Sequence, residues 1–224
     1  MTLELVYETH SITEDNEAGL ATGWLPGRLS AQGRALAAEL GRRRPSSGFA
    51  ALHASDLARA VETATIAYAG SDVPLHLDAR LRECDYGTLN GAPVAELARV
   101  RRDHLDEPFP GGGQSYRQVV EATAAFLDDL RRHHDGQRVL VIAHSANRWA
   151  LQHLLEGVPL EHLVDAPFDW QPRLGVDDQV TRGGRHTASW SEAGPNATKL
   201  LSSWHSPSES SVSPTSESRR CSTR

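Results

Sequence analysis

Residues 139–145 read VLVIAHS, and this stretch decides the fold. Residues 139–143 form an unbroken apolar run, which is typical of a strand buried on both faces of a parallel sheet. His144 and Ser145 follow directly, where the strand would end. In open α/β sheets, ligands bind outside the carboxyl ends of the strands. The stretch therefore predicts both a parallel sheet and the edge of that sheet at which chemistry takes place.

The rest of residues 1–172 alternates short apolar runs with longer amphipathic stretches. Ser30 is expected to cap a helix whose inner face carries Leu36, Ala37 and Leu40. The alternation predicts an α/β fold, a three-layer α/β/α sandwich with a mostly parallel central sheet. Strands are expected at residues 3–7, 49–54, 74–77 and 139–143, and helices at residues 30–43, 57–68, 115–133 and 147–155.

Length and composition exclude several classes of protein. The chain has 224 residues, which fits one domain with an appendage, and its formal net charge of −6 argues against a nucleic-acid-binding protein. Cys84 and Cys221 are too few for a disulfide scaffold. No apolar run approaches the ~18 residues of a membrane span, and the N-terminus lacks the features of a secretory signal. We therefore expect a cytoplasmic protein with no membrane or nucleic-acid partner, and leave its oligomeric state open, a homodimer included.

Composition changes near Pro172. Residues 173–224 are poor in apolar side chains, and the last 24 residues contain ten serines. Such a segment cannot bury enough apolar surface to offset the entropy lost on ordering. We therefore expect a folded domain over residues 1–172 and a Ser-rich, disordered or aberrant tail over residues 173–224.

Four predicted strand ends carry polar groups that suit one site. His10 lies just past the first strand, and Arg59 lies in the first turn of the helix that follows the second. Glu83 lies beyond the third strand, and His144 directly follows the fourth. Because the carboxyl ends of parallel strands share one edge of the sheet, we expect these side chains to converge.

Each of these residues also has a structural interpretation. Arg59 could pair with Glu62 on a helix surface, and Glu83 could pair with Arg80 or Arg82. Two histidines also suggest a metal site, but such a site needs further ligands at supporting spacing, and no H-E-x-x-H pattern is present. We assign no metal ligand and expect no cofactor.

Three segments around these positions resemble the histidine phosphatase superfamily, also called the phosphoglycerate-mutase-like family. Residues 55–64 (SDLARAVETA) are similar to its Ser-x-Leu-x-Arg-Ala-x-x-Thr-Ala motif. Residues 81–87 (LRECDYG) resemble its Leu-x-Glu-x-x-x-Gly segment. Residues 110–115 (PGGGQS) resemble its Gly-Gly-Glu-Ser loop, with one extra glycine and glutamine in place of glutamate.

The resemblance extends to both histidines. Thr13 and Asn16 keep the family's spacing from His10, and residues 139–144 resemble the strand that delivers its second histidine. The similarity covers residues 3–172, with the motifs in the family's order. It implies a phosphoglycerate-mutase-like fold and, for the phosphatase branch, hydrolysis of small phosphorylated substrates.

The resemblance also implies a role for each of the four converging residues. His10 would be the nucleophile and form a phosphohistidine that water later hydrolyses. Glu83 would be the general acid that protonates the leaving group. Arg59 and His144 would bind the phosphoryl oxygens and stabilise charge during transfer. The further phosphate-binding groups implied are Asn16, Ser11 and Ser145.

The chain departs from the family pattern at Thr9. The family places arginine directly before the nucleophilic histidine, and Thr9 has no charge to replace it. Loss of one donor from a transition-state site costs on the order of 10²–10³ in rate. A catalytically weakened phospho-ligand-binding or regulatory module is therefore an alternative to a phosphatase. A phosphoglycerate-type mutase is a second alternative, but mutases carry a longer insertion than the segment that separates Glu83 from Gly111.

The second departure is at the end of the chain. Residues 168–172 (FDWQP) match a stretch after which relatives continue with one more strand, but no strand alternation follows Arg173. One hypothesis is that a readthrough or a shifted reading frame has replaced that strand, and another is a genuine disordered tail.

Overall fold

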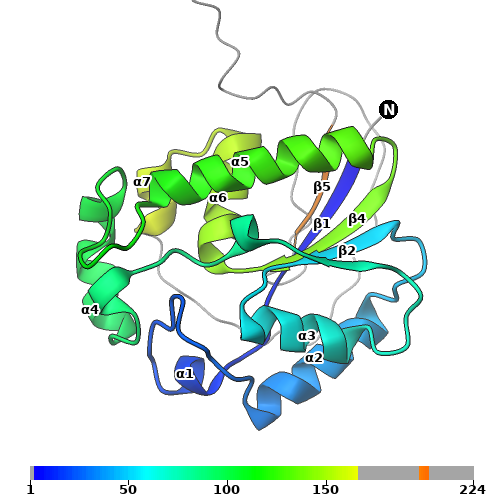
Figure 1. Ribbon diagram of the computed structural model, residues 1–224, viewed down its shortest axis with the longest axis horizontal. Coiled ribbons are helices and arrows are strands. Elements are labelled where there is room, and N and C mark those ends of the chain that lie inside the picture. The colour runs from blue at the N-terminus through cyan, green and yellow to red at the C-terminus, as the bar shows by residue number, and fades with distance from the viewer. Residues whose placement is uncertain (1–2, 166–196, 202–224) are drawn as a thin grey trace, which may run out of the picture.

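A computed structural model describes residues 3–165 and 197–201, and these residues form one central sheet (Figure 1). The strand order is β3-β2-β4-β1-β5. All neighbouring pairs are parallel except β1 and β5, which are antiparallel. The predicted mostly parallel sheet is thereby confirmed. The strands are β1 (Leu3–Thr9), β2 (Ala51–Ala54), β3 (Leu75–Leu77), β4 (Arg138–Ala143) and β5 (Ala197–Leu201).

Helices cover both faces of this sheet (Figure 1). On one face lie α2 (Ala31–Arg43) and α3 (Ala58–Ala67), and on the other lie α5 (Tyr116–His133) and α6 (Ser145–Glu156). The predicted three-layer α/β/α fold is therefore confirmed. The shorter helical elements are α1 (Glu14–Glu17), η1 (Ala79–Leu81), η2 (Gly87–Leu89), α4 (Val94–Val100), η3 (Arg101–His104) and α7 (Leu160–Val164).

Strand β4 is apolar throughout because both of its faces are covered. Val139 and Val141 join the cluster under α5 and α6, whereas Leu140 and Ile142 join the cluster over α2 and α3. All four side chains are at most 1% exposed. The unbroken apolar run therefore reflects burial on two sides, as the sequence predicts.

The helix boundaries follow from local capping. The hydroxyl of Ser30 accepts a hydrogen bond from the amide of Gly33, so the predicted cap of α2 is confirmed. Ser115 and Gln118 form a capping box at the start of α5. The helix predicted at residues 147–155 begins earlier, at Ser145, directly after His144. The second histidine therefore lies at the N-terminus of a helix.

Strand β5 corrects one expectation. It lies within residues 173–224, where no strand was predicted, and its backbone pairs with β1 from Leu3 opposite Leu201 to Tyr7 opposite Ala197. The sequence ATKLL shows no alternation, so the pairing with the open edge of β1 decides its conformation. The rest of the tail lies outside the described residues, and the domain limits stay a prediction.

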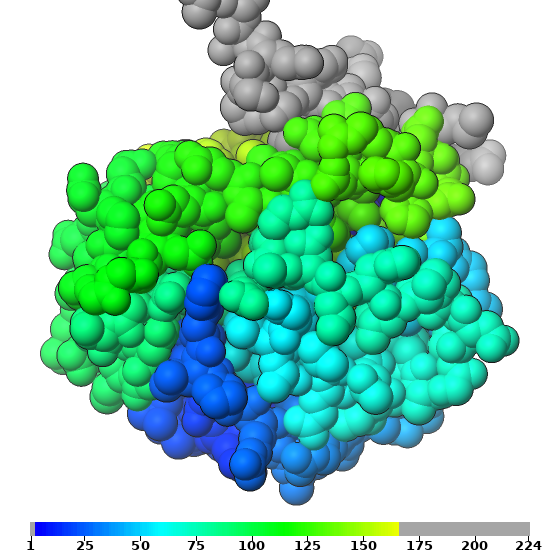
Figure 2. Space-filling model, in the orientation of Figure 1, coloured from blue at the N-terminus to red at the C-terminus, as the bar shows by residue number. Residues whose placement is uncertain are grey.

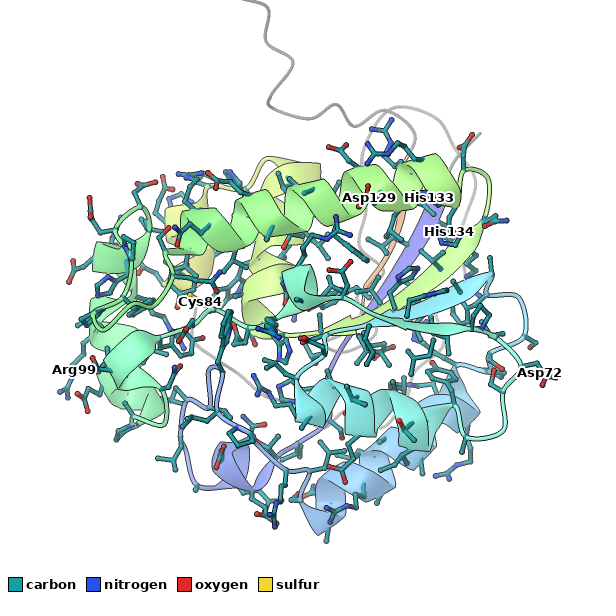
Figure 3. All side chains as sticks on the ribbon, in the orientation of Figure 1. Asp72, Cys84, Arg99, Asp129, His133 and His134 are labelled. Carbon is teal, nitrogen blue, oxygen red and sulfur yellow. The ribbon has the colours of Figure 1, made fainter. Side chains whose placement is uncertain are left out.

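A cluster of histidines lies at the other edge of the sheet. The ring of His53, on β2, stacks on His76 of β3 with the centroids 5.2 Å apart, and it meets edge-on, at 5.4 Å, the ring of His134, which follows α5 and is labelled in Figure 3. Burial, together with the neighbouring His134 and His76, lowers the pKa of His53 to about 4, and the charge of Asp78 opposes the shift. His53 therefore stays neutral in the folded protein at pH values where a solvated histidine takes up a proton.

This difference predicts acid-sensitive stability. In the unfolded chain His53 takes up a proton near pH 6.5, whereas in the folded chain it does so only near pH 4. The free energy of unfolding should therefore fall by on the order of 2 kcal/mol as the pH is lowered from above 6.5 toward 4. Urea unfolding of the wild type and of His53→Leu at pH 7.5 and pH 4.5 measures it. The variant should lose less stability than the wild type on acidification, and the exposed-site control His133→Gln should match the wild type. An unchanged pH dependence in His53→Leu would contradict the prediction.

Candidate active site

The parallel pairing of β1 with β4 sets the two predicted site histidines side by side. Thr9 pairs with Ala143 at the ends of these strands, and the amide of His10 donates to the carbonyl oxygen of Ala143 over 2.9 Å. The centroids of the His10 and His144 rings are 5.0 Å apart, and the ring planes are inclined by 54°. The structure thus brings both imidazoles to one edge of the sheet.

The hydrogen bonds of His10 identify its tautomer. Nδ1 lies 2.7 Å from the carbonyl oxygen of Ser11, which can only accept, so Nδ1 carries the proton. Nε2 accepts from Nε of Arg59 at 3.3 Å, so its lone pair is free of a proton. Burial and the charge of Arg59 lower the pKa of His10 to about 3, against the effect of the Ser11 bond. At neutral pH, His10 therefore presents an unprotonated nitrogen to the site.

Arg59 is a buried cation beside that nitrogen. It lies in the first turn of α3, is 1% exposed, and donates from Nη2 to the carbonyl oxygen of Gly23 at 2.8 Å and from Nη1 to that of Leu25 at 3.4 Å. Burial lowers its pKa, and the charge of Glu83 opposes this effect. Glu62 instead pairs with Arg34 at 2.7 Å, so the structural alternative of an Arg59–Glu62 pair is excluded.

Glu83 is a buried carboxyl group at the N-terminus of α6. Its Oε1 accepts from the amides of Cys84 at 2.9 Å and Ala146 at 3.3 Å. Burial raises the pKa of Glu83, while these two amides and the charges of Arg59 and Arg101 oppose the shift. A carboxyl group with a raised pKa can hold a proton and donate it, which is what a general acid requires.

The suggested surface pairs of Glu83 do not form. Arg80 pairs with Asp78 and Asp129, and Arg82 pairs with Asp56 through two hydrogen bonds of 2.6 and 2.7 Å. The carboxyl group of Glu83 is therefore left to its two backbone amides.

His144 is fully buried, and neither of its ring nitrogens has a hydrogen-bond partner among the described residues. Its backbone is fixed instead: the hydroxyl of Tyr7 donates to its carbonyl oxygen, and its amide donates to Oδ1 of Asn147 at 3.2 Å. Burial and the charge of Arg59 hold the pKa of His144 well below its usual value. An unpartnered buried polar group is costly, so a neutral imidazole in this position suits a ligand oxygen.

The loop after His10 is anchored from two helices through both hydrogen-bond donors of Ser11. The Ser11 hydroxyl donates to the carbonyl oxygen of Gly33 at 2.7 Å, and its amide donates to Oγ1 of Thr63 at 3.0 Å. Oγ1 of Thr63 in turn donates to the carbonyl oxygen of Arg59 at 2.7 Å. Both donors of Ser11 are therefore used to hold the loop in place, and a contact of Ser11 with phosphate stays a prediction.

Asn16 and Ser145 are placed differently from each other. Oδ1 of Asn16 accepts from the amide of Thr13 in the capping box of α1, so only the NH₂ group of Asn16 remains as a donor. Ser145 is the first residue of α6, where helix amides have no partner within the helix. Their contacts with a ligand stay a prediction.

Among residues 3–165 and 197–201, no second cation contacts His10 in place of the arginine that Thr9 lacks. Arg82 is held by Asp56, and the Arg28 side chain is exposed with no salt bridge among residues 3–165 and 197–201. Arg59 is therefore the cation that contacts His10 in the described part of the chain.

Three residues near the site were missed from the sequence. Trp24 donates from its indole nitrogen to the carbonyl oxygen of Glu83 at 2.6 Å. Arg101 is 6% exposed and lies over the ring of Trp149 at 5.4 Å. Thr63 links Arg59 to the loop of His10 through one hydroxyl. The motif around Arg59 contains Thr63, but no pattern in the sequence singles out Trp24 or Arg101.

Other chemistry finds little support in the described residues. No group of three His, Cys, Asp or Glu side chains there could hold a metal ion. Cys84, labelled in Figure 3, is buried, and this burial raises the pKa of its thiol. The thiol therefore stays protonated, which does not suit a nucleophile. Among the helices of residues 3–165, none is long and apolar enough to cross a membrane.

Comparison with known proteins gives a family match. The family model of the histidine phosphatase superfamily (branch 1) matches residues 9–171. A 2,3-bisphosphoglycerate-dependent phosphoglycerate mutase of Methylobacterium sp. (strain 4-46) is 34% identical over 172 residues, which cover 70% of this chain and 82% of that protein.

Solved structures are similar as well. YhfR of Bacillus stearothermophilus is 27% identical, has a TM-score of 0.65, and matches over 74% of this chain and 86% of its own. A phosphoserine phosphatase mutant from Entamoeba histolytica, in complex with phosphoserine, is 25% identical with a TM-score of 0.60, over 69% of this chain and 80% of its own.

The position of Thr63 predicts the effect of removing its hydroxyl. In Thr63→Val the partly buried amide of Ser11 loses its acceptor, which should lower the free energy of unfolding by about 1–3 kcal/mol in urea titrations. Thr63→Ser keeps the hydroxyl and loses only a methyl group, so it should cost less than the valine variant. A larger loss in Thr63→Ser than in Thr63→Val would show that packing of the methyl group, rather than the hydrogen bonds of the hydroxyl, is what the residue contributes.

Proposed function

The chain belongs to the histidine phosphatase superfamily, and on that premise we propose that it hydrolyses small phosphate monoesters through a phosphohistidine on His10. Members of the superfamily are phosphatases and mutases, so both hydrolysis and transfer are within its chemistry. The substrate is a small phosphorylated molecule, and no cofactor enters the reaction.

The observation that carries the proposal is the state of His10. Its Nδ1 proton is bound by the carbonyl oxygen of Ser11, and its bare Nε2 points to a guanidinium. A nucleophile toward phosphorus needs a free lone pair, and a phosphoryl group needs a cation for its oxygens. Nε2 of His10 with Arg59 supplies both within 3.3 Å.

The reaction proceeds in two steps, formation of the phosphohistidine and its hydrolysis. In the first, Nε2 of His10 forms a bond to phosphorus, the ester P–O bond breaks, and Glu83 gives its proton to the leaving oxygen. In the second, water attacks phosphorus, Glu83 takes a proton from that water, and the P–N bond breaks to release phosphate and His10. The raised pKa of Glu83 suits both directions of this proton transfer.

The oxygens of the transferring group need donors while charge builds up on them. Arg59 offers its guanidinium once a phosphate oxygen competes with the carbonyl oxygens of Gly23 and Leu25. The unpartnered imidazole of His144 offers one N–H, and it stays neutral because burial depresses its pKa. These groups act on the phosphoryl group, which every monoester shares, and leave the substrate's identity open.

Two alternatives have specific support. Because Thr9 carries no charge, Arg59 is the cation beside His10 that is available to a phosphoryl group in the described part of the chain. Very slow turnover would therefore favour a phospho-ligand-binding or regulatory module. The identity to phosphoglycerate mutases favours transfer from His10 to a second substrate hydroxyl instead of water. Against the mutase, the segment between Glu83 and Gly111 is short and holds only α4, η2 and η3.

Hydrolysis assays test the proposed function. The purified chain should release phosphate from p-nitrophenyl phosphate or phosphoserine, and His10→Ala should abolish the release because it removes the nitrogen that forms the bond to phosphorus. His133→Ala, an exposed histidine, is the matched control and should keep wild-type rates. Equal rates from the wild type and His10→Ala would overturn the phosphatase. Phosphoryl transfer to a phosphoglycerate at the expense of hydrolysis would favour the mutase.

A Thr9→Arg variant measures what the missing arginine costs. A second guanidinium at the end of β1 should raise kcat/KM for p-nitrophenyl phosphate by up to about 10²-fold. Thr9→Gln has comparable reach without the charge and should give a small change. If both variants leave the rate unchanged, the charge at position 9 does not limit the reaction.

A further inference from the structure

The segment Gly23-Trp24-Leu25, in the loop between α1 and α2, contacts two of the proposed catalytic residues at once. The carbonyl oxygens of Gly23 and Leu25 accept from the guanidinium of Arg59 at 2.8 and 3.4 Å. Between them, the indole nitrogen of Trp24 donates to the carbonyl oxygen of Glu83 at 2.6 Å. One tripeptide therefore bridges the phosphate-binding arginine and the acid.

This tripeptide is itself held from the far side. Oδ1 of Asn90 accepts from the amides of Trp24 at 3.4 Å and Tyr86 at 3.0 Å. Gly23 has φ +55°, and a Cβ at this position would lie 1.8 Å from that same oxygen, so only glycine fits. The loop between α1 and α2 lies between the α4 segment and the residues around η1, as Figure 2 shows in blue, green and cyan.

The ring of Trp24 has a contact of its own, with the side chain of Arg82. Cζ of Arg82 lies 4.7 Å from the ring, and Arg82 is in turn held by the two oxygens of Asp56. Arg82 directly precedes Glu83 in the chain, so the ring of Trp24 contacts the side chain of one residue and its indole nitrogen contacts the carbonyl oxygen of the next. A charged guanidinium stacked on an indole and held by a carboxylate restricts the ring's rotation.

We propose that Trp24 is a positioning residue for the general acid, acting through the backbone of Glu83, and this inference rests on the proposed phosphatase reaction. The carboxyl end of Glu83 is fixed by the amides of Cys84 and Ala146, and Trp24 fixes the carbonyl end. An indole N–H that packs inside a protein usually finds some hydrogen-bond acceptor. Here the acceptor is the backbone carbonyl of Glu83, so the bond also fixes the position of the carboxyl group that gives its proton to the leaving oxygen.

The proposal predicts a dependence on the leaving group. A p-nitrophenolate leaves readily without a proton, whereas the alkoxide of phosphoserine needs one from Glu83. Trp24→Phe keeps an aromatic ring for Arg82 and removes the N–H. It should lower kcat for phosphoserine by about tenfold, a part of the 10²–10⁴ that general acids supply, and leave p-nitrophenyl phosphate within about twofold.

Leu75→Ala is the control. Its side chain is 38% exposed, and it lies on β3 and has no contact with Arg59 or Glu83 among the hydrogen bonds of the site. It should leave the ratio of the two rates unchanged. A second readout needs no turnover: in carboxyl ¹³C NMR, the resonance of Glu83 should move in Trp24→Phe and stay in place in Leu75→Ala.

The outcomes separate this proposal from the phosphatase itself. A selective loss on phosphoserine in Trp24→Phe supports positioning of the acid. An equal loss on both substrates, or no loss on either, overturns it and leaves the phosphatase intact. If the wild type hydrolyses neither substrate, the proposed function fails, and NMR then decides the role of Trp24. An unmoved Glu83 resonance in Trp24→Phe overturns the positioning role, and a moved one supports it.

Discussion

The hydrogen bond from the amide of His10 to the carbonyl oxygen of Ala143 is the contact on which the site depends. It extends the parallel pairing of β1 and β4 by one residue beyond Thr9, so the chain leaves both strands at the same level. The imidazoles that follow then have to share one space, with their centroids 5.0 Å apart. Arg59 and Glu83 come to the same place because α3 and the turn after η1 begin at the same edge of the sheet.

The electrostatics of this space follow from burial with few charges. Burial keeps His10 and His144 neutral and raises the pKa of Glu83. Arg59 is the charged side chain that donates a hydrogen bond to His10. A phosphate dianion would bring in the negative charge that this cation lacks. The same burial makes the histidines costly in acid, because the unfolded chain takes up protons that the folded chain refuses. Catalytic readiness and acid sensitivity therefore have one physical origin.

The sequence predicts the layers, the parallel sheet and the four converging residues, because continuous apolar runs and strand ends are local signals. Features that depend on contacts between residues far apart in the sequence are not predicted from it. The hydroxyl of Ser11 could have faced a ligand, and only the position of Gly33 decides that it anchors a loop. Trp24 lies in a loop without periodicity, so its contact with Glu83 has no local signal. β5 forms because β1 has an open edge, and its own five residues show no alternation.

Trapping of the covalent intermediate tests most directly whether Nε2 of His10 is the nucleophile. The chain would be mixed with a monoester labelled in its phosphoryl group, denatured in base, and mapped by peptide analysis. We expect one acid-labile, base-stable phosphoryl group, on Nε2 of His10, and none in His10→Ala. Phosphate release without any label on His10, or a label on another residue, would contradict the proposed mechanism.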